Sequence, residues 1–252
     1  MMKKSITAIA LVSACLMTSC GDYNKVLKSQ DYSYRYEAAK EYFFSGQYTK
    51  ASVVLNDMIA ILKGSGKAEE SLYMLAMCYY GQGDWLEASS TFKKYYTTYP
   101  RGEFAELARF YTCKSLYNDT PEPRLDQTST FEAINEIQVF CEYYPSSVYK
   151  DEAQRMMFEL QDKLVEKEYL SARLYYNLGN YMGNNYRSCV ITAQNALQDF
   201  PYANVARIFL TWCSWRSTKW RARVSSRSGK SVIATWLTSI MPSRMNSLKA
   251  ST

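Results

Sequence analysis

Residues 39–51 read AKEYFFSGQYTKA and residues 76–88 read AMCYYGQGDWLEA, so similar side chains recur at a constant offset of 37 residues. The recurring positions are Ala39 and Ala76, Tyr42 and Tyr79, Gly46 and Gly83, Tyr48 and Trp85, and Ala51 and Ala88. Small residues let two antiparallel helices approach closely, and a glycine between two apolar-periodic stretches marks a helix end. The spacing predicts pairs of helices that turn at the two glycines; a generic helical bundle with chance spacing is the alternative.

Prolines mark the end of each predicted helix pair. Pro100, Pro145 and Pro201 each follow an aromatic residue and lie 12 residues after Ala88, Ala133 and Cys189, respectively. Proline cannot continue the interior of a helix, so these positions are predicted breaks between pairs. The third pair is stretched by a polar loop over residues 118–127, and the fourth pair is irregular. We therefore predict an all-α fold, an α-solenoid of tetratricopeptide-like helix pairs over residues 31–206.

The amino-terminal segment has the pattern of an export signal. Lys3-Lys4 precede an apolar run that ends at Met17, and small residues lead from there to Cys20. The run is about a dozen residues, whereas a membrane-spanning helix needs ~20. Cysteine at the cleavage point resembles a bacterial lipobox, in which the thiol carries diacylglycerol. We predict a signal peptide over residues 1–19, lipid attachment at Cys20 and a lipidated tether over residues 20–30. Cys15 is the competing lipid site, and an ordinary secretory signal is the alternative.

Positive charge is confined to the end of the chain. The net charge is +6, but residues 207–252 hold nine Lys/Arg and no Asp/Glu, while residues 1–206 hold 21 Lys/Arg and all 24 Asp/Glu. A basic protein often binds nucleic acid or anionic membranes. Here the helix pairs are slightly acidic and no DNA-binding motif is present, so we predict no nucleic-acid partner.

The segment from Arg207 to Thr252 is aberrant, because it offers little amphipathic period and no helix-pair signature. When synonymous codons for this segment are read two nucleotides further on, they can encode an acidic, helix-compatible sequence. That sequence again has an aromatic residue and a small apolar residue 15 and 12 positions before a Phe-Pro, as Tyr186 and Cys189 stand before Pro201. We interpret residues 207–252 as an out-of-frame tail. A genuine basic tail that binds anionic lipid is the alternative.

Residue types for catalysis are sparse. The chain has no histidine, which removes the commonest general base and the commonest metal ligand. No G-x-S-x-G and no Gly-rich phosphate loop occur, and acidic pairs such as Glu69-Glu70 are interpreted as solvated helix faces. The later cysteines lack C-x-x-C spacing and are expected to be buried free thiols: Cys78, Cys113, Cys141, Cys189 and Cys213. We predict no enzyme, no catalytic residue, no metal site and no cofactor.

The first helices of the pairs carry a candidate binding stripe. An α-solenoid offers a concave groove along these helices. Spacings of four and three residues place aromatic, cationic and apolar side chains on one helix face, and the 37-residue offset repeats the stripe. The predicted groove for a substrate peptide consists of Tyr36, Lys40, Phe43, Tyr73, Met77, Tyr80 and Arg109. Aromatic stacking and cationic contacts to carboxylates would hold an extended peptide; the alternative is that some of these residues belong to the inter-helix core.

From the signal to about Ala206 the chain resembles the BamD family, lipoproteins of the outer-membrane β-barrel assembly machinery. The resemblance rests on the lipobox, the short tether and the tetratricopeptide-like pairs. It implies a periplasm-facing protein that is anchored in the outer membrane by the lipid on Cys20. It also implies that the amino-terminal repeats receive unfolded outer-membrane protein precursors. The carboxy-terminal repeats would dock on the barrel-forming assembly subunit.

Two other functions are compatible with a helical-repeat lipoprotein. One is a solenoid that captures glycans for an uptake system, although such proteins are usually far longer and carry large insertions. The other is a cell-wall enzyme carried on a helical solenoid, which needs a catalytic acid in a cleft and a domain to house it.

Sequencing the gene across the codons for Asn204 to Thr252 tests the out-of-frame tail. We expect an inserted or missing base near the codon for Arg207, because the acidic helix-pair pattern returns in another frame. A gene that encodes the printed tail without such a base would refute this interpretation.

Overall fold

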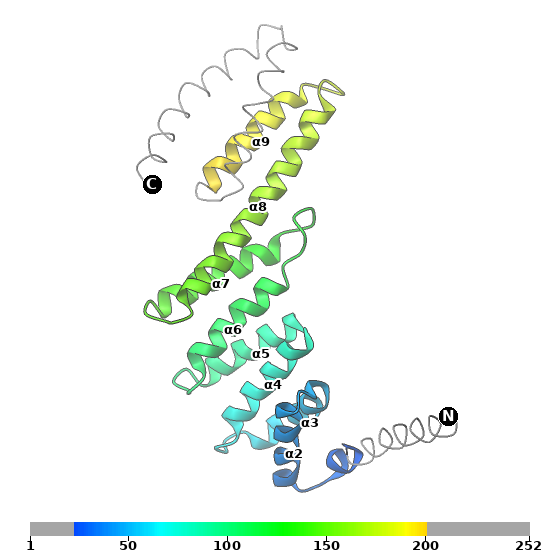
Figure 1. Ribbon diagram of the computed structural model, residues 1–252, viewed down its shortest axis with the longest axis vertical. Helices are drawn as coiled ribbons and strands as arrows, with labels where there is room; N and C mark the ends of the chain where they lie inside the picture. The colour runs from blue at the N-terminus through cyan, green and yellow to red at the C-terminus, as the bar shows by residue number, and fades with distance from the viewer. Residues whose placement is uncertain (1–22, 201–252) are drawn as a thin grey trace, which may run out of the picture. The chain divides into compact units, whose positions relative to one another are not determined.

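The computed structural model describes residues 23–200, and all the regular structure within this range is helical (Figure 1). The predicted signal peptide, Cys20 and the tail from residue 207 lie outside the described residues, as does Cys213. The described part divides into two compact units. Unit 1 holds residues 23–121 and 127–157, and unit 2 holds residues 122–126 and 158–200.

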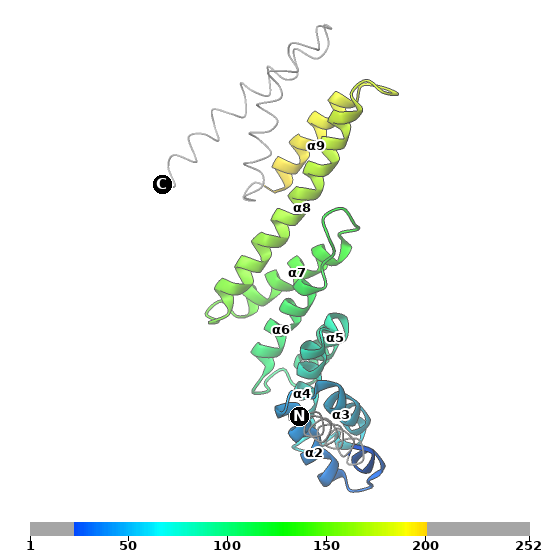
Figure 2. The same cartoon turned by 45° about the vertical axis from the view of Figure 1, so that its right-hand side comes forward.

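Unit 1 is a succession of antiparallel helices, each packed on the next (Figure 2). A short helix over residues 23–28 precedes three pairs. The pairs are α2 (Tyr32–Phe44) with α3 (Tyr48–Leu62), α4 (Ala68–Gln82) with α5 (Trp85–Thr98), and α6 (Ala105–Asn118) with α7 (Thr128–Tyr143). The first residues of α8 (Lys150–Leu178) complete the unit. The prediction of an all-α solenoid of helix pairs is confirmed.

The turns within the first two pairs form where the repeated glycines stand. Gly46 and Gly83 have φ values of 75° and 81°, in the left-handed region that glycine enters without steric cost. The backbone N–H of Gly83 caps α4 by donating to the carbonyl groups of Tyr79 and Tyr80. Tyr48 and Trp85 are the first residues of α3 and α5, as the offset predicts.

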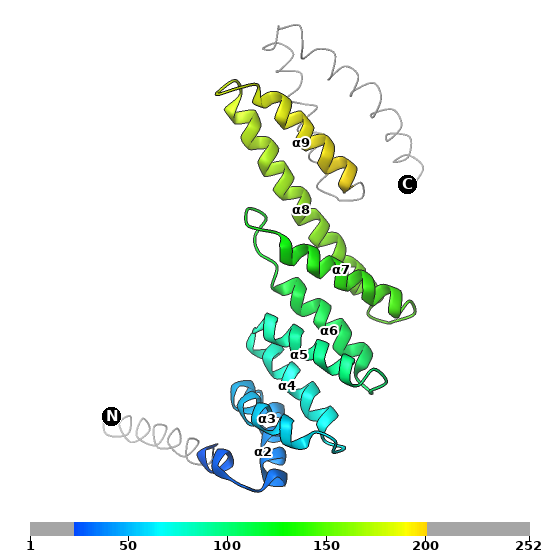
Figure 3. The same cartoon turned by 180° about the vertical axis from the view of Figure 1, so that it is seen from behind.

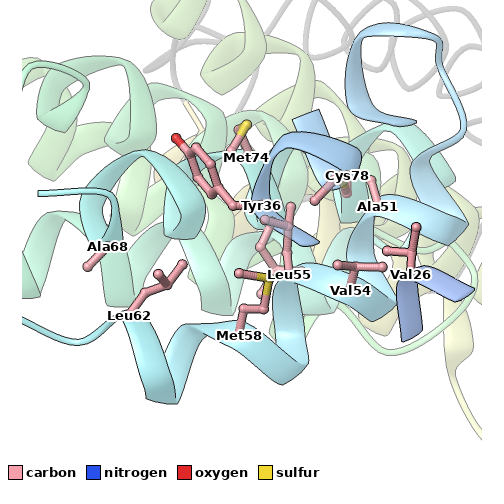
Figure 4. Packing of buried hydrophobic residues seen from close by; sticks show 12 residues of the cluster. Val26, Tyr36, Ala51, Val54, Leu55, Met58, Leu62, Ala68, Met74 and Cys78 are labelled. Atoms are coloured by element: carbon pink, nitrogen blue, oxygen red, sulfur yellow. The ribbon is translucent and has the colours of Figure 1, made fainter. Parts of the chain in front are cut away.

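The repeated alanines allow the close packing of the pairs. Ala39, Ala51, Ala76 and Ala88 are all fully buried. Ala39 and Ala51 belong to a cluster of buried apolar side chains from the 23–28 helix, α2, α3 and α4. The members labelled in Figure 4 are Val26, Tyr36, Ala51, Val54, Leu55, Met58, Leu62, Ala68, Met74 and Cys78. Because a methyl group is all that stands between the helix backbones at these positions, neighbouring large side chains can interdigitate.

The breaks between pairs also agree with the sequence. Helix α5 ends at Thr98, two residues before Pro100, and α7 ends at Tyr143, two residues before Pro145. The connection from α6 to α7 covers residues 119–127, which is the polar loop that was expected to stretch the third pair. At the start of α2 the Asp31 carboxylate accepts hydrogen bonds from two backbone N–H groups and caps the helix.

Unit 2 is built from the later part of α8, a turn and α9 (Asn185–Asp199). Its buried side chains include Leu160, Val165, Ala172, Cys189 and Ala193. Helix α8 has 29 residues, about twice the length of the others, so the fourth pair is irregular as expected. None of the helices between residues 23 and 200 is both long and apolar enough to cross a membrane.

Replacing Gly46 with alanine tests the turn geometry. A Cβ at this position meets nothing within 4 Å, so the cost arises from the positive φ alone. We expect a loss of about 1 kcal/mol in the free energy of unfolding, measured with urea. Gly66→Ala is the matched control, because Gly66 has equal space and no positive φ. Equal stabilities of the two variants would contradict the left-handed turn.

Candidate functional site

The predicted groove residues lie on the first helix of each pair in unit 1. Helix α2 carries Tyr36, Lys40 and Phe43, helix α4 carries Tyr73, Met77 and Tyr80, and helix α6 carries Arg109. Tyr36 is only 2% exposed, whereas the other six are half-buried. The alternative of an inter-helix core residue therefore holds for Tyr36. The other six are partly exposed at the surface of unit 1.

A charged cluster joins α2 to α4 around Tyr36. The Tyr36 hydroxyl donates a hydrogen bond to the Glu70 carboxylate, and the Lys40 ammonium lies 2.8 Å from the other Glu70 oxygen. The contacts with Lys40 and Tyr36 hold the pKa of Glu70 below its usual range, and burial followed by the Glu70 contact raises the pKa of Tyr36. The ammonium groups of Lys67 and Lys40 lie 4.3 and 5.4 Å from the centre of the Tyr36 ring. Aromatic and cationic groups are thus held together at this surface.

The interpretation of Glu69-Glu70 as a solvated helix face is wrong. Both side chains are half-buried and bonded to neighbouring helices. One Glu69 oxygen accepts hydrogen bonds from the Tyr95 hydroxyl at 2.6 Å and from the backbone N–H of Glu103 at 3.1 Å. Tyrosine hydroxyl groups that lie deep between helices need an acceptor, and these two carboxylates supply it.

Aromatic contacts connect α4, α5 and α6. Tyr73 stacks on Phe104 with 4.5 Å between ring centres, and burial raises its pKa. Tyr80 makes edge contacts with Trp85 at 5.2 Å and Tyr111 at 5.0 Å. These rings therefore fix the helices of the second and third pairs against each other, and their remaining edges contribute apolar surface.

Phe43 and Met77 supply apolar surface beside these clusters. Phe43 packs against the core of the first pair and makes edge contacts with Phe44 and Tyr48 at 5.4 and 6.0 Å. Its neighbour Phe44 is 76% exposed, so this ring pair reaches solvent. Met77 packs on the core that α4 shares with α5 and α6.

Arg109 is held between two tyrosine rings. Its guanidinium carbon lies 4.5 Å from the centre of the Tyr96 ring and 4.2 Å from that of Tyr143. The Tyr96 hydroxyl donates to Glu136 at 2.9 Å. One guanidinium nitrogen of Arg109 is buried and has no hydrogen-bond partner in the described structure. Because Tyr143 is 67% exposed, the stack presents both a cation and an aromatic edge at the surface.

An open hollow of about 600 Å³ lies next to this stack in unit 1. It is formed by the loop before α6 and by the turn between α7 and α8, and it is lined by Glu103, Phe104, Glu106, Leu107 and residues 143–149. The Ser147 hydroxyl donates to Glu106 at 2.6 Å and fixes the turn. The hollow exposes apolar surface, notably Val148, which is 85% exposed.

The described cysteines are free, as expected. Cys78, Cys113 and Cys189 are buried, and Cys141 is half-buried. Burial raises the pKa of Cys78 to about 12 and that of Cys189 to about 11, so these thiols stay protonated and unreactive near neutral pH. Among residues 23–200 no group of three or more Cys, Asp and Glu side chains is placed to hold a metal ion.

Sequence reasoning missed the partners that shape the stripe. Tyr96, Tyr143 and Phe104 lie on second helices or loops, and helical spacing along the first helices does not reach them. Glu70 lies 34 residues after Tyr36 in the sequence. Because Glu69 stands next to it, the two carboxylates were interpreted as a solvated helix face. A buried tyrosine opposite an acidic residue is the signal that identifies this contact.

Stacked helix pairs with aromatic and cationic side chains at their surface define a helical-repeat protein. A model of the YfiO family, described as outer membrane lipoprotein, matches residues 28–212. The match covers most of the chain, so the chain belongs to the YfiO family of outer membrane lipoproteins. This is the BamD-like family that the lipobox and the repeats resemble. No curated protein matches the chain.

Glu70→Gln tests the charged cluster through pH. The pKa of Glu70 is lowered in the folded state, so its contribution is present above its ordinary value of 4.5 and is lost as pH falls through the lowered value. At pH 7 we expect a loss of about 0.5–1 kcal/mol in the free energy of unfolding, because the side chains are partly exposed.

The loss should become smaller as pH falls below 4.5, and urea unfolding at pH 7 and at pH 3 measures the change. Glu41→Gln on α2 is the control, because Glu41 is exposed. An equal loss at both pH values would show that Glu70 acts through packing alone.

Proposed function

We propose that this chain is an outer-membrane lipoprotein of the β-barrel assembly machinery, anchored by lipid on Cys20 and facing the periplasm. In this role it is a scaffold and a receptor for unfolded outer-membrane protein precursors during their folding and insertion. Its carboxy-terminal repeats dock on the barrel-forming subunit. The protein performs no covalent step and needs no cofactor.

The family match over residues 28–212 is the observation that carries this proposal. Members of such a family act as scaffolds, and the all-α solenoid supports that role, because each added helix pair extends a binding surface without a catalytic domain. The match also begins inside the tether and continues through all the described helix pairs. The function is therefore proposed for the helices of both units.

The surface chemistry of unit 1 supports the receptor role. An unfolded barrel precursor is an extended chain in which apolar and aromatic residues alternate with polar ones. Phe43 and Phe44 present apolar edges, and Lys40 remains 29% exposed although it pairs with Glu70. Arg109 and Tyr143 offer a second cationic and aromatic surface two helix pairs further along. Together these groups suit an aromatic-rich segment with an occasional carboxylate.

The arrangement favours weak, multiple contacts. Each exposed ring contributes little binding free energy alone, and the side chains beneath it are already fixed by the core, so little conformational entropy is lost when a peptide binds. A receptor for precursors needs this property, because it must release its ligand to the barrel-forming subunit.

Site-specific photocrosslinking tests the receptor role. A photoreactive phenylalanine analogue replaces Phe43 or Phe44 in the mature chain, and the probe is an unfolded outer-membrane barrel precursor held in solution by urea dilution. We expect crosslinked product at either position. The control position is Phe131, which is 56% exposed but lies on α7, the second helix of its pair. We expect at least fivefold less product there.

Equal crosslinking at Phe131 and Phe44 would contradict a receptor surface on the first helices. Retention of the chain on immobilised cell-surface glycan, with no precursor crosslinked, would favour the glycan-binding alternative. Co-purification of the barrel-forming subunit with the lipidated chain tests the scaffold role separately.

A further inference from the structure

The short helix over residues 23–28 is part of the folded core, although it belongs to the predicted tether. Val26 is only 2% exposed and lies in the same apolar cluster as α2, α3 and α4 (Figure 4). Tyr23 and Leu27 are half-buried and pack on that cluster. Figure 3 shows this helix, in blue, joined to α2 by a short connection. The segment is thus docked on the first helix pair.

Aromatic and cationic contacts hold the beginning of the docked helix. The Tyr23 ring makes an edge contact with Tyr42 of α2 at 5.8 Å. The Lys50 ammonium of α3 lies 5.8 Å from the centre of the Tyr23 ring and 5.6 Å from that of Tyr42. Burial, and then the nearby charge of Asp57, raise the pKa of Tyr23. Tyr23 is therefore fixed to both helices of the first pair.

The opposite side of the docked helix is polar and exposed. Asn24, Lys25 and Lys28 are all exposed, while Tyr23, Val26 and Leu27 face the core. Lys25 and Lys28 are three residues apart, so they lie on one face of the helix. This face carries two positive charges from two turns of helix, and it suits the phosphate groups of anionic phospholipids.

The chain between the proposed lipid site and Tyr23 is very short. Only Gly21 and Asp22 separate Cys20 from Tyr23. Three steps between consecutive Cα atoms cover at most about 11 Å, whatever conformation these residues adopt. A flexible linker of many residues would let a domain move freely above the bilayer. Here the distance from the lipid-bearing residue to the core is limited by covalent geometry.

We propose that residues 23–28 act as a docked strut that holds the first helix pair against the phospholipid surface, with the Asn24, Lys25 and Lys28 face toward the headgroups. The proposal rests on the proposed function, because it requires lipid on Cys20. It adds a membrane-contacting helix face and a limited distance between the lipid-bearing residue and the first helix pair. Lipid attachment alone requires neither. The membrane then restricts how the first pair can turn, and the surface on α2 keeps a constant height above the bilayer.

Collision of a spin label with lipid headgroups tests the strut. The full lipidated chain with Lys28→Cys carries a nitroxide and is reconstituted in vesicles of phosphatidylethanolamine and phosphatidylglycerol with a nickel-chelating lipid. Power saturation then measures how often the nitroxide meets the nickel. The lipidated chain without Lys28→Cys gives the background from the native thiols, and mass spectrometry of the amino-terminal peptide establishes whether Cys20 is lipidated.

Two variants separate a docked strut from a loose tether. In the first, eight Gly/Ser residues are inserted between Asp22 and Tyr23; in the second, Val26→Asp removes the buried anchor of the helix. We expect each to lower the collision parameter at least threefold. Gln30→Asp is the control for Val26→Asp, because it adds the same charge at an exposed position, and we expect no such fall. The insertion variant leaves the core intact, so it remains informative if Val26→Asp fails to fold.

The outcomes distinguish the strut from the proposed function. If Cys20 is lipidated and the insertion leaves the collision parameter unchanged, the strut is overturned and the lipoprotein role stands. If Cys20 carries no lipid, both the anchor and the strut are overturned.

Discussion

Close contact between antiparallel helices is the constraint on which unit 1 depends. Ala39, Ala51, Ala76 and Ala88 are fully buried, and larger side chains there would push the helices apart. Once the backbones are this near, the rings on either side must interleave, which places Phe92 and Tyr95 at the centre of the second pair. Each pair then presents an apolar face that only the next pair can cover. The small residues thereby set how closely neighbouring helices pack in unit 1.

The same packing decides how much of the predicted stripe on the first helices remains accessible. Tyrosine has an apolar ring and a polar tip, so it can take part in the core and reach the surface at once. Tyr36 uses its ring in the core and its hydroxyl on Glu70, whereas Tyr143 keeps most of its ring in solvent over Arg109. The cations lie against ring faces or carboxylates that already orient them. The charges of the predicted stripe are therefore already oriented by the protein itself.

The helix pairs could be predicted from the sequence because the residues that end each helix act on their own segment of the backbone. Gly46, Gly83 and the prolines act through the backbone of their own segment, so the helix ends could be predicted within a residue or two. The stripe was harder to predict. Helical spacing gives the face of one helix, but Tyr96 of α5 contacts Arg109 of α6, and Glu70 of α4 contacts Tyr36 of α2. No periodicity within a helix encodes such contacts between helices. Burial of Tyr36 likewise follows from how the first pair meets the second.

The free cysteines have a consequence for where the fold can form. Every cysteine between residues 23 and 200 is unpaired, and burial protects three of the four thiols from oxidants. The described helices are therefore held together without a disulfide, and a reducing agent removes no crosslink from them. No disulfide joins the described helices, but their four thiols are exposed until the helix pairs meet, so an oxidising compartment can crosslink the chain before it folds. Meeting of the helix pairs therefore does more than close the core: it also shields Cys78, Cys113 and Cys189 from oxidants.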